Sequence, residues 1–256
     1  MKYLNDITND CAGKVFKSKL SGDFKILKYN DSRNVVIQFL KTGFETVTRL
    51  DCVRNGNIKD PYLPSVCGVG IIGTKYPSKI NGVHTKEYTL WCNMLKRCYS
   101  TTLKKKYPTY KDCEASDNFL YYEYFYEWCN SQIGFGNQDW QLDKDLLFKG
   151  SKVYSEDSCV FIPKEINSLL TKSDKVRGKH LIGVHYHKTN KAFVAQVGKN
   201  KGGQKHLGYF KTELEAFNAY KIAKEAFVKE QANVWKSQID PRAYKALMNY
   251  TVNIDD

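Results

Sequence analysis

The sequence predicts an α+β protein built from several small modules. The chain has 256 residues, which is enough for one large domain or for two to four small ones. Hydrophobic residues make up 42% and aromatic residues 14% of the chain, so folded cores are expected. Periodicities typical of strands and of helices follow one another along the sequence. We expect five segments, at residues 1–64, 65–135, 136–175, 176–235 and 236–256.

The first segment is expected to be a small β-rich domain. Between residues 20 and 53 apolar and polar positions alternate, and Gly22 and Gly43 interrupt the alternation. This pattern is typical of short strands joined by turns, and it predicts a small β-barrel or ribbon in residues 1–64. The segment carries no motif that we can connect to a reaction, so we interpret it as an accessory DNA-contacting or partner-binding domain.

The second segment, residues 65–135, is expected to be helical and rich in aromatic residues. An apolar stripe at helical spacing predicts a helix over residues 86–99. A second helix is predicted at about residues 117–132, with Asp117 as its N-cap. Its many aromatic side chains could stack on bases, but such a belt is more often buried, and we expect it to form a core.

The cysteine pattern and the hydropathy predict a reduced, cytoplasmic location. None of the eight cysteines forms a C-x-x-C pair, so buried thiols are expected rather than a zinc ribbon. The first residues carry no apolar core of signal-peptide length, and no stretch approaches the length of a membrane span. We therefore expect no membrane partner.

The fourth segment, residues 176–235, is predicted to be a three-stranded antiparallel sheet packed on one helix. Residues 181–186, 193–197 and 205–210 have the pattern of strands, and Thr212 is a predicted cap for a helix over about residues 213–230. The last segment, residues 236–256, is expected to be a C-terminal tail.

Positive charge is concentrated in this predicted sheet. The formal net charge of the whole chain is +13. Between residues 177 and 212 there are eight Lys or Arg and no Asp or Glu. Residues 177–236 contain twelve basic and four acidic residues, a net charge of +8, and all four acids lie in the predicted helix. A charge that only kept the protein in solution would be mixed and spread, so this pattern predicts a nucleic-acid partner.

The same region resembles the apetala/ethylene-response-factor (AP-two) DNA-binding domain over about fifty residues. The matching pieces are Gly183-Val184, Leu207-Gly208-Tyr209-Phe210 and Glu215-Ala216-x-x-Ala219-Tyr220. The resemblance implies that the sheet enters the major groove of double-stranded DNA. Lysine, histidine and glutamine stand where the family has arginines, and Phe193 stands where a tryptophan is usual, so we expect modest sequence specificity. The nucleic-acid-binding residues that it implies are His185, His187, Lys188, Lys191, Phe193, Gln196, Lys199, Lys201 and Lys205.

The third segment resembles the ββα unit of HNH nucleases, as found in phage and intron-homing endonucleases that also carry an AP-two domain. In those enzymes the first strand ends in Asp-His: the histidine is the general base, and the aspartate binds a divalent metal with a residue of the following helix. Here Asp143-Lys144 matches that pair, Asp145 follows, and Asn167 lies on the predicted helix. The resemblance implies a degenerate catalytic group of Lys144, Asp143 and Asp145.

The metal ligands that the resemblance implies are Asp143 and Asn167, with Mg²⁺ or Mn²⁺ as the cofactor if the unit is active. No cofactor is required for DNA binding. Lysine is a poor general base, and two neighbouring aspartates favour its charged form. We therefore expect that the nuclease chemistry is lost, or that it is altered if Lys144 works with a carboxylate.

Three hypotheses for the function follow. The first is a double-stranded DNA-binding protein of phage or mobile-element type, present in the cytoplasm of a bacterial host cell and derived from an HNH endonuclease whose catalytic base is replaced. The second is an active, divalent-metal-dependent HNH-type endonuclease or nickase. The third is a phage inhibitor of a host enzyme or defence system that acts through a host protein partner.

Overall fold

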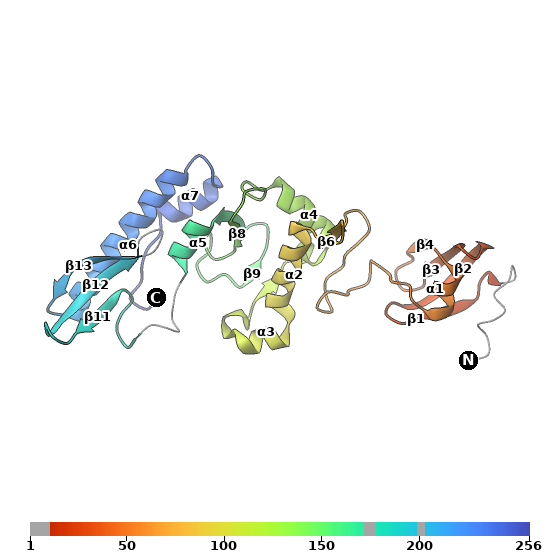
Figure 1. The fold of residues 1–256 in the computed structure, drawn as a ribbon, viewed down its shortest axis with the longest axis horizontal. Helices are drawn as coiled ribbons and strands as arrows, with labels where there is room; N and C mark the ends of the chain where they lie inside the picture. Colours follow the sequence, from red (N-terminus) through yellow and green to blue (C-terminus); the bar gives the residue numbers. More distant parts are fainter. Residues whose placement is uncertain (1–10, 172–177, 199–202) are drawn as a thin grey trace. The chain divides into compact units, whose positions relative to one another are not determined.

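The computed structural model describes residues 11–171, 178–198 and 203–256 (Figure 1). It confirms a mixed α and β protein with several antiparallel sheets. The chain divides into two compact units, Met1–Tyr126 and Glu127–Asp256, in place of the five segments expected from the sequence.

The first unit begins with an open four-stranded meander. Its strands follow the order β1-β2-β3-β4, so β1 and β4 lie at the two edges; of the two expected forms, barrel or ribbon, the described strands make an open sheet and not a closed barrel. Four short strands are too few to close around a filled interior. The bounds are β1 Val15–Ser18, β2 Gly22–Asp31, β3 Asn34–Phe39, β4 Glu45–Thr48 and the helix α1 Leu50–Asn55. The apolar face of this sheet is buried, with Phe24, Ile26 and Phe39 fully covered.

The rest of the first unit contains a short hairpin and the predicted helices. The bounds are β5 Lys79–Ile80, β6 Val83–His84, α2 Lys86–Tyr99, α3 Thr101–Lys106, η2 Pro108–Tyr110, β7 Glu114–Ala115, η3 Asn118–Leu120 and α4 Tyr122–Ser131. The helix predicted over residues 86–99 is confirmed. The helix predicted at residues 117–132 is interrupted, because Tyr121 has an extended backbone (φ −98°, ψ 118°) between η3 and α4. Asp117 precedes η3 without a side-chain capping bond.

The aromatic belt forms a core, as expected. Trp91, Phe119, Tyr122 and Phe125 are fully buried. The Trp91 indole Nε1 donates a 2.8 Å hydrogen bond to the Phe119 carbonyl, which satisfies its polar atom inside the core. These side chains are therefore unavailable for stacking on bases.

The second unit contains a hairpin followed by a helix, as predicted, but with shorter strands. The bounds are β8 Trp140–Asp143, β9 Val153–Tyr154, β10 Val160–Pro163 and α5 Lys164–Leu170. Strand β8 pairs with β10 in antiparallel register from Trp140↔Pro163 to Asp143↔Val160. Residues 144–148 belong to a loop, because the Asp143 side chain accepts hydrogen bonds from the backbone amides of Asp145 and Leu146 and turns the chain.

The unit ends with the predicted three-stranded sheet and its helix. The bounds are β11 Val184–His187, β12 Ala192–Gly198, β13 Gln204–Phe210, α6 Glu213–Trp235 and α7 Pro241–Met248. The sheet has the order β11-β12-β13 and packs on α6, which lies along it in Figure 1. Thr212 and Glu215 form a capping box at the start of α6. The expected tail is part of this module, since α7 packs on α6 and Val252 is buried in the core of the sheet.

The eight cysteines remain thiols, and five of them are buried. Across the described part of the chain, no helix is both long enough and apolar enough to cross a membrane.

Candidate nucleic-acid interface

The three-stranded sheet has one face on α6 and one face turned away from it, and we name the second the outer face. The pairing register defines it, since residues opposite each other on neighbouring strands point to the same side. His185 pairs with Val194, which pairs with Tyr209, and Gln196 pairs with His206. The outer face therefore consists of His185, His187, Ala192, Val194, Gln196, His206 and Tyr209.

Imidazole and phenol rings gather at the centre of the outer face. The Tyr209 ring lies 5.7 Å from the His187 ring and 5.0 Å from the His206 ring, measured between centroids. Tyr209 is 52% exposed, whereas Val194, its partner on β12, is only 2% exposed. The rings thus lie over an apolar position of β12, and imidazole and phenol groups combine ring surface with hydrogen-bonding atoms.

Lysines lie beside this ring cluster. Lys188 and Lys191 lie in the turn between β11 and β12 and are exposed. Lys205, also predicted to bind nucleic acid, is exposed on β13 but pairs with Val197, so it lies on the helix-facing side of the sheet. The His187 Nδ1 atom accepts a 3.2 Å bond from the backbone amide of Asn190, which fixes the turn beside the ring cluster. Lys199 and Lys201, also predicted to bind nucleic acid, lie outside the described residues.

Acidic residues of α6, which lies on the other side of the sheet, accept hydrogen bonds from backbone amides. Glu213 accepts a 2.6 Å bond from the Leu181 amide and lies 3.3 Å from the His180 ring. Glu215 accepts the amides of Lys211 and Thr212 at the start of α6.

Glu225 binds the chain that follows α7. It accepts the Val252 amide at 2.9 Å and pairs with Lys221 at 3.2 Å. Burial opposes the charge of Glu225, but the bond from Val252 and the Lys221 ammonium together hold the pKa of this carboxyl below its usual range. Structural use of the carboxylates leaves the outer face with positive and neutral groups.

Phe193 does not belong to the outer face. It lies on the helix-facing side, opposite Phe210, and its ring contacts Tyr186 at 5.2 Å and His180 at 5.6 Å. Phe193 and Gln196, both predicted to bind nucleic acid, therefore lie on different sides of the sheet, because positions 193 and 196 of one strand point to opposite faces.

Two residues of the outer face were missed by sequence reasoning. Tyr209 received no binding role, and His206 was considered as a structural residue. A bulge between Ala195 and Gln196 shifts the pairing, so that His206 stands opposite Gln196. The alternation along β13 indicates a side for Tyr209, but the side of His206 depends on this bulge, which is not visible in the sequence.

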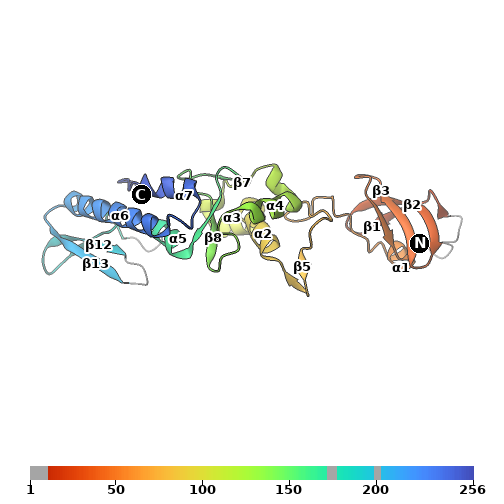
Figure 2. The same cartoon turned by 90° about the horizontal axis from the view of Figure 1, so that it is seen from above.

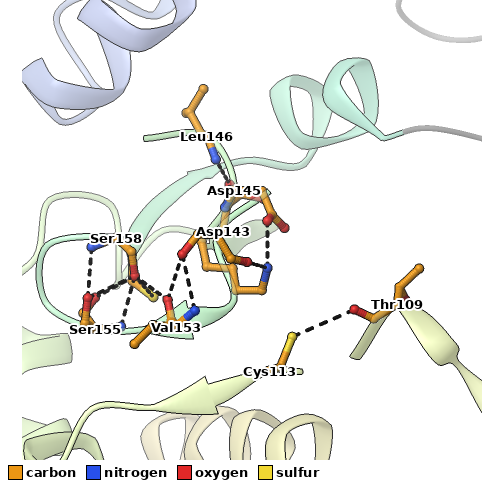
Figure 3. Close-up of polar contacts among 11 residues, drawn as sticks. Thr109, Cys113, Asp143, Asp145, Leu146, Val153, Ser155 and Ser158 are labelled. Atoms are coloured by element: carbon orange, nitrogen blue, oxygen red, sulfur yellow. Dashed lines mark hydrogen bonds and ion pairs between the residues drawn. The ribbon is translucent and has the colours of Figure 1, made fainter. Parts of the chain in front are cut away.

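In the HNH-like unit, Asp143 ends strand β8 and holds the loop that follows (Figure 3). Its Oδ1 atom accepts the backbone amides of Asp145 at 3.0 Å and of Leu146 at 2.7 Å. Burial raises the pKa of the Asp143 carboxyl, against the effect of these bonds. In this structure the predicted metal ligand acts as a turn-forming side chain.

Lys144 points into the protein rather than toward a substrate. The residue is only 7% exposed, and its Nζ atom lies 2.6 Å from Asp145 Oδ1 and donates to the Ser151 carbonyl. The ammonium also lies 5.6 Å from the centre of the Tyr154 ring. A carboxylate, a carbonyl and a ring face all stabilise the charged form of an amine, so the geometry opposes its use as a general base.

Asn167, the second metal ligand that the HNH resemblance implies, has a partner of its own. It donates its amide to Gln141 Oε1 at 2.5 Å, and Gln141 stands two residues before Asp143 on β8. Within residues 11–171, 178–198 and 203–256, no three His, Cys, Asp or Glu side chains are grouped so that they could hold a metal ion. In this structure Asp143 and Asn167 are thus both engaged in hydrogen bonds within the protein.

Comparisons of the chain with protein-family models, with curated proteins and with solved structures find no match. The function must therefore be inferred from the surfaces and side chains described above.

Proposed function

We propose that this protein binds double-stranded DNA through the outer face of the β11–β13 sheet. The observation that supports this most is the composition of that face: rings of His187, His206 and Tyr209, bordered by lysines, on a segment from residue 178 to 212 without an Asp or Glu. Lysines attract phosphates, and imidazole, phenol and amide groups can bond to base edges. The protein is of phage or mobile-element type and derives from an HNH endonuclease with its catalytic base replaced.

A sheet of this kind is suited to a groove of duplex DNA. The major groove is about 12 Å wide and admits a β-ribbon. Neighbouring strands lie about 4.8 Å apart, so three strands present a surface of similar width. Lysine contacts phosphate as a point charge and does not form the bidentate bonds that arginine makes with guanine. We therefore expect modest preference among sequences, and a selection from random duplexes should return a short, degenerate site.

The salt dependence of duplex binding tests the proposal. Each phosphate contact that is lost should reduce the slope of log affinity against log salt by about 0.9. We expect this reduction for Lys188→Ala and Lys191→Ala taken singly. Lys28→Ala, an exposed lysine of the N-terminal sheet, is the control and should leave the slope unchanged. Unchanged slopes in both variants would place the DNA elsewhere and favour a protein partner for the basic surface.

The histidines provide an independent test of the same face. Replacing His185, His187 and His206 together by alanine removes three rings whose nitrogens can bond to base edges, and should weaken duplex affinity.

We further propose that the HNH-like unit does not cleave DNA. Its Lys144 ammonium is stabilised by Asp145 and the Ser151 carbonyl, and Asn167 is engaged with Gln141. Incubation with supercoiled plasmid and Mg²⁺ or Mn²⁺ should therefore leave the plasmid intact. Nicking that requires metal and disappears in Asp143→Ala would overturn this part of the proposal and support the endonuclease hypothesis.

A further inference from the structure

A small β-hairpin stands out from the first unit between two structured segments. Strands β5 and β6 pair as Lys79↔His84 and Ile80↔Val83. Asn81 and Gly82 form the turn, both with positive φ (51° and 80°), as the tight two-residue turn of a twisted hairpin requires. Figure 2 shows this hairpin, labelled β5, projecting beyond α2.

The tip of the hairpin is apolar and exposed. Ile80 is 59% and Val83 is 71% exposed, and the two are directly paired, so they lie side by side on one face of the ribbon. Lys79 and His84, the next pair, point to the opposite face and are also exposed. The two side chains thus form a small apolar pair at the end of the hairpin, accessible to a partner.

The base of the hairpin is held firmly. The Tyr122 hydroxyl donates to the Pro77 carbonyl at 3.0 Å and lies 3.0 Å from Thr85 Oγ1, so one buried side chain holds both ends. The His84 ring stacks on Tyr88 with centroids 4.8 Å apart, and its Nδ1 lies 3.1 Å from the Ser78 carbonyl.

The segment that leads into the hairpin is fixed to α4. Glu123 accepts the backbone amides of Thr74 at 2.7 Å and Lys75 at 2.6 Å, and the Tyr76 and Tyr126 rings are stacked at 4.0 Å. Because the base of the hairpin is held by these contacts, its tip can enter a partner without losing its own conformation.

We propose that the β5–β6 hairpin is a wedge that inserts Ile80 and Val83 between base pairs from the minor groove of duplex DNA and bends it. The inference rests on the proposed DNA-binding function and adds a second contact to it, in the other unit of the chain. Apolar side chains inserted in this way partly unstack a base step and kink the duplex by about 20–90°.

Charge favours a polyanionic partner for this tip, and the proposed function makes that partner DNA. Residues 74–86 contain three lysines and one histidine and no Asp or Glu. The first acid beyond them, Glu87, is 9% exposed. Phosphates border the minor groove on both sides, so a hairpin that has an apolar end and basic flanks complements it.

Bending and base unstacking are measured on the full-length protein. The probe is a duplex of about 30 base pairs with a central TA step, the kind of step that kinks most easily. Fluorophores at its two ends report bending, and 2-aminopurine beside the central step reports unstacking. The variant is Ile80→Ser with Val83→Ser, which removes apolar surface only from exposed positions. Ile222→Ser, a residue of α6 that is 71% exposed, is the matched control.

The native protein and the control are expected to bend the duplex and to raise 2-aminopurine fluorescence. The double variant should lose both signals and about tenfold in affinity, with an unchanged salt slope, because its phosphate contacts remain. A duplex that is bound but stays straight, or that bends equally with the double variant, would overturn the wedge and leave DNA binding by the sheet intact. A native protein that binds no duplex at all would overturn both.

Discussion

The N-terminal and C-terminal sheets share one design and differ in what they expose. Both are antiparallel meanders with one apolar face and a helix that follows the last strand. In the first, residues 15–48 carry six basic and three acidic residues, so the charges are mixed. In the second, residues 178–212 carry seven lysines and no acid. Similar folds therefore provide no evidence of similar function, and the composition of the free face distinguishes the two sheets.

The positions of the acidic residues explain why the outer face of the second sheet carries no negative charge. Its carboxylates sit on α6, where Glu213 holds the start of β11, Glu215 caps the helix and Glu225 binds the returning chain. In the first sheet, by contrast, Glu45 on β4 bonds to Gln38 across the strands. A surface that binds a polyanion needs its acids elsewhere, and the second module places them where the fold uses them.

The largest expected effect compares the two cores. Phe24→Ala in the first sheet and Phe217→Ala under the second should each lower the free energy of unfolding of their own domain by about 3–5 kcal/mol, because both rings are buried. Only Phe217→Ala should abolish duplex binding. Calorimetry locates the transitions, and fluorescence anisotropy at a temperature between the lowered transition of each variant and the native transition measures duplex binding. Loss of binding in Phe24→Ala with the second module still folded would assign DNA contacts to the first sheet.

A smaller loss of stability is expected from Gly183→Ala at the entrance to β11. Gly183 has φ +76°, and a Cβ there would lie 2.1 Å from Cδ2 of the buried Tyr220 ring. Strain and displacement of the ring should lower the free energy of unfolding by about 2–3 kcal/mol and weaken DNA binding in proportion. Gly198→Ala, where no atom lies within 4 Å of the added carbon, is the control. Equal melting temperatures of the two variants would contradict this packing.

The next effect separates the two faces of the C-terminal sheet. Tyr209→Ala removes the centre of the outer-face ring cluster and should weaken duplex affinity about tenfold, near 1.4 kcal/mol. Tyr186→Ala removes a ring of similar exposure, 42% against 52%, from the helix-facing side. Its affinity should stay within twofold of the native value, roughly the error of such titrations. If Tyr186→Ala weakened binding more than Tyr209→Ala, the outer face would not be the DNA-binding face.

The smallest effect concerns pH and the loop after β8. Burial raises the pKa of the Asp143 carboxyl above its ordinary value. The folded state then binds this proton more tightly than the unfolded state, so stability should fall as the pH rises through the raised pKa. Asp143→Asn keeps the acceptor oxygen and removes the charge. We expect a flatter decline of melting temperature between about pH 4 and pH 7. Asp23→Asn, exposed on β2, should follow the native curve.

Much of the fold could be predicted because its signals are local. The stripe and caps of α2 lie within the helix, and Thr212 with Glu215 marks the start of α6. The failures depend on contacts between distant residues. Closure of the first sheet depends on whether β1 meets β4, and the assignment of residues 236–256 as a tail failed because Val252 packs beneath β12 and α6.

For the candidate site, the sequence predicts the face of a residue where side chains alternate regularly along a strand. His185, His187 and Gln196 lie on the outer face, as expected from their exposed strand positions. Phe193 has the opposite parity to Gln196, so a strict count along β12 would have excluded it. His206 needed the bulge at Ala195, and the burial of Lys144 needed the path of the loop to Ser151. Neither a bulge nor a loop path can be derived from spacing alone.

The burial of Val252 also affects the order in which the protein folds during synthesis. The core of the first sheet is complete once Ile58 has emerged from the ribosome, whereas the C-terminal core waits for Val252. At translation rates of about 5–20 residues per second, the intervening segment of about 190 residues takes roughly 10–40 s to make. The three basic strands are complete at Phe210, so they exist without their full core while the last 42 residues of that segment are added, about 2–8 s. A nascent chain therefore cannot hold the β11–β13 sheet in final form before nearly all of these residues have been added.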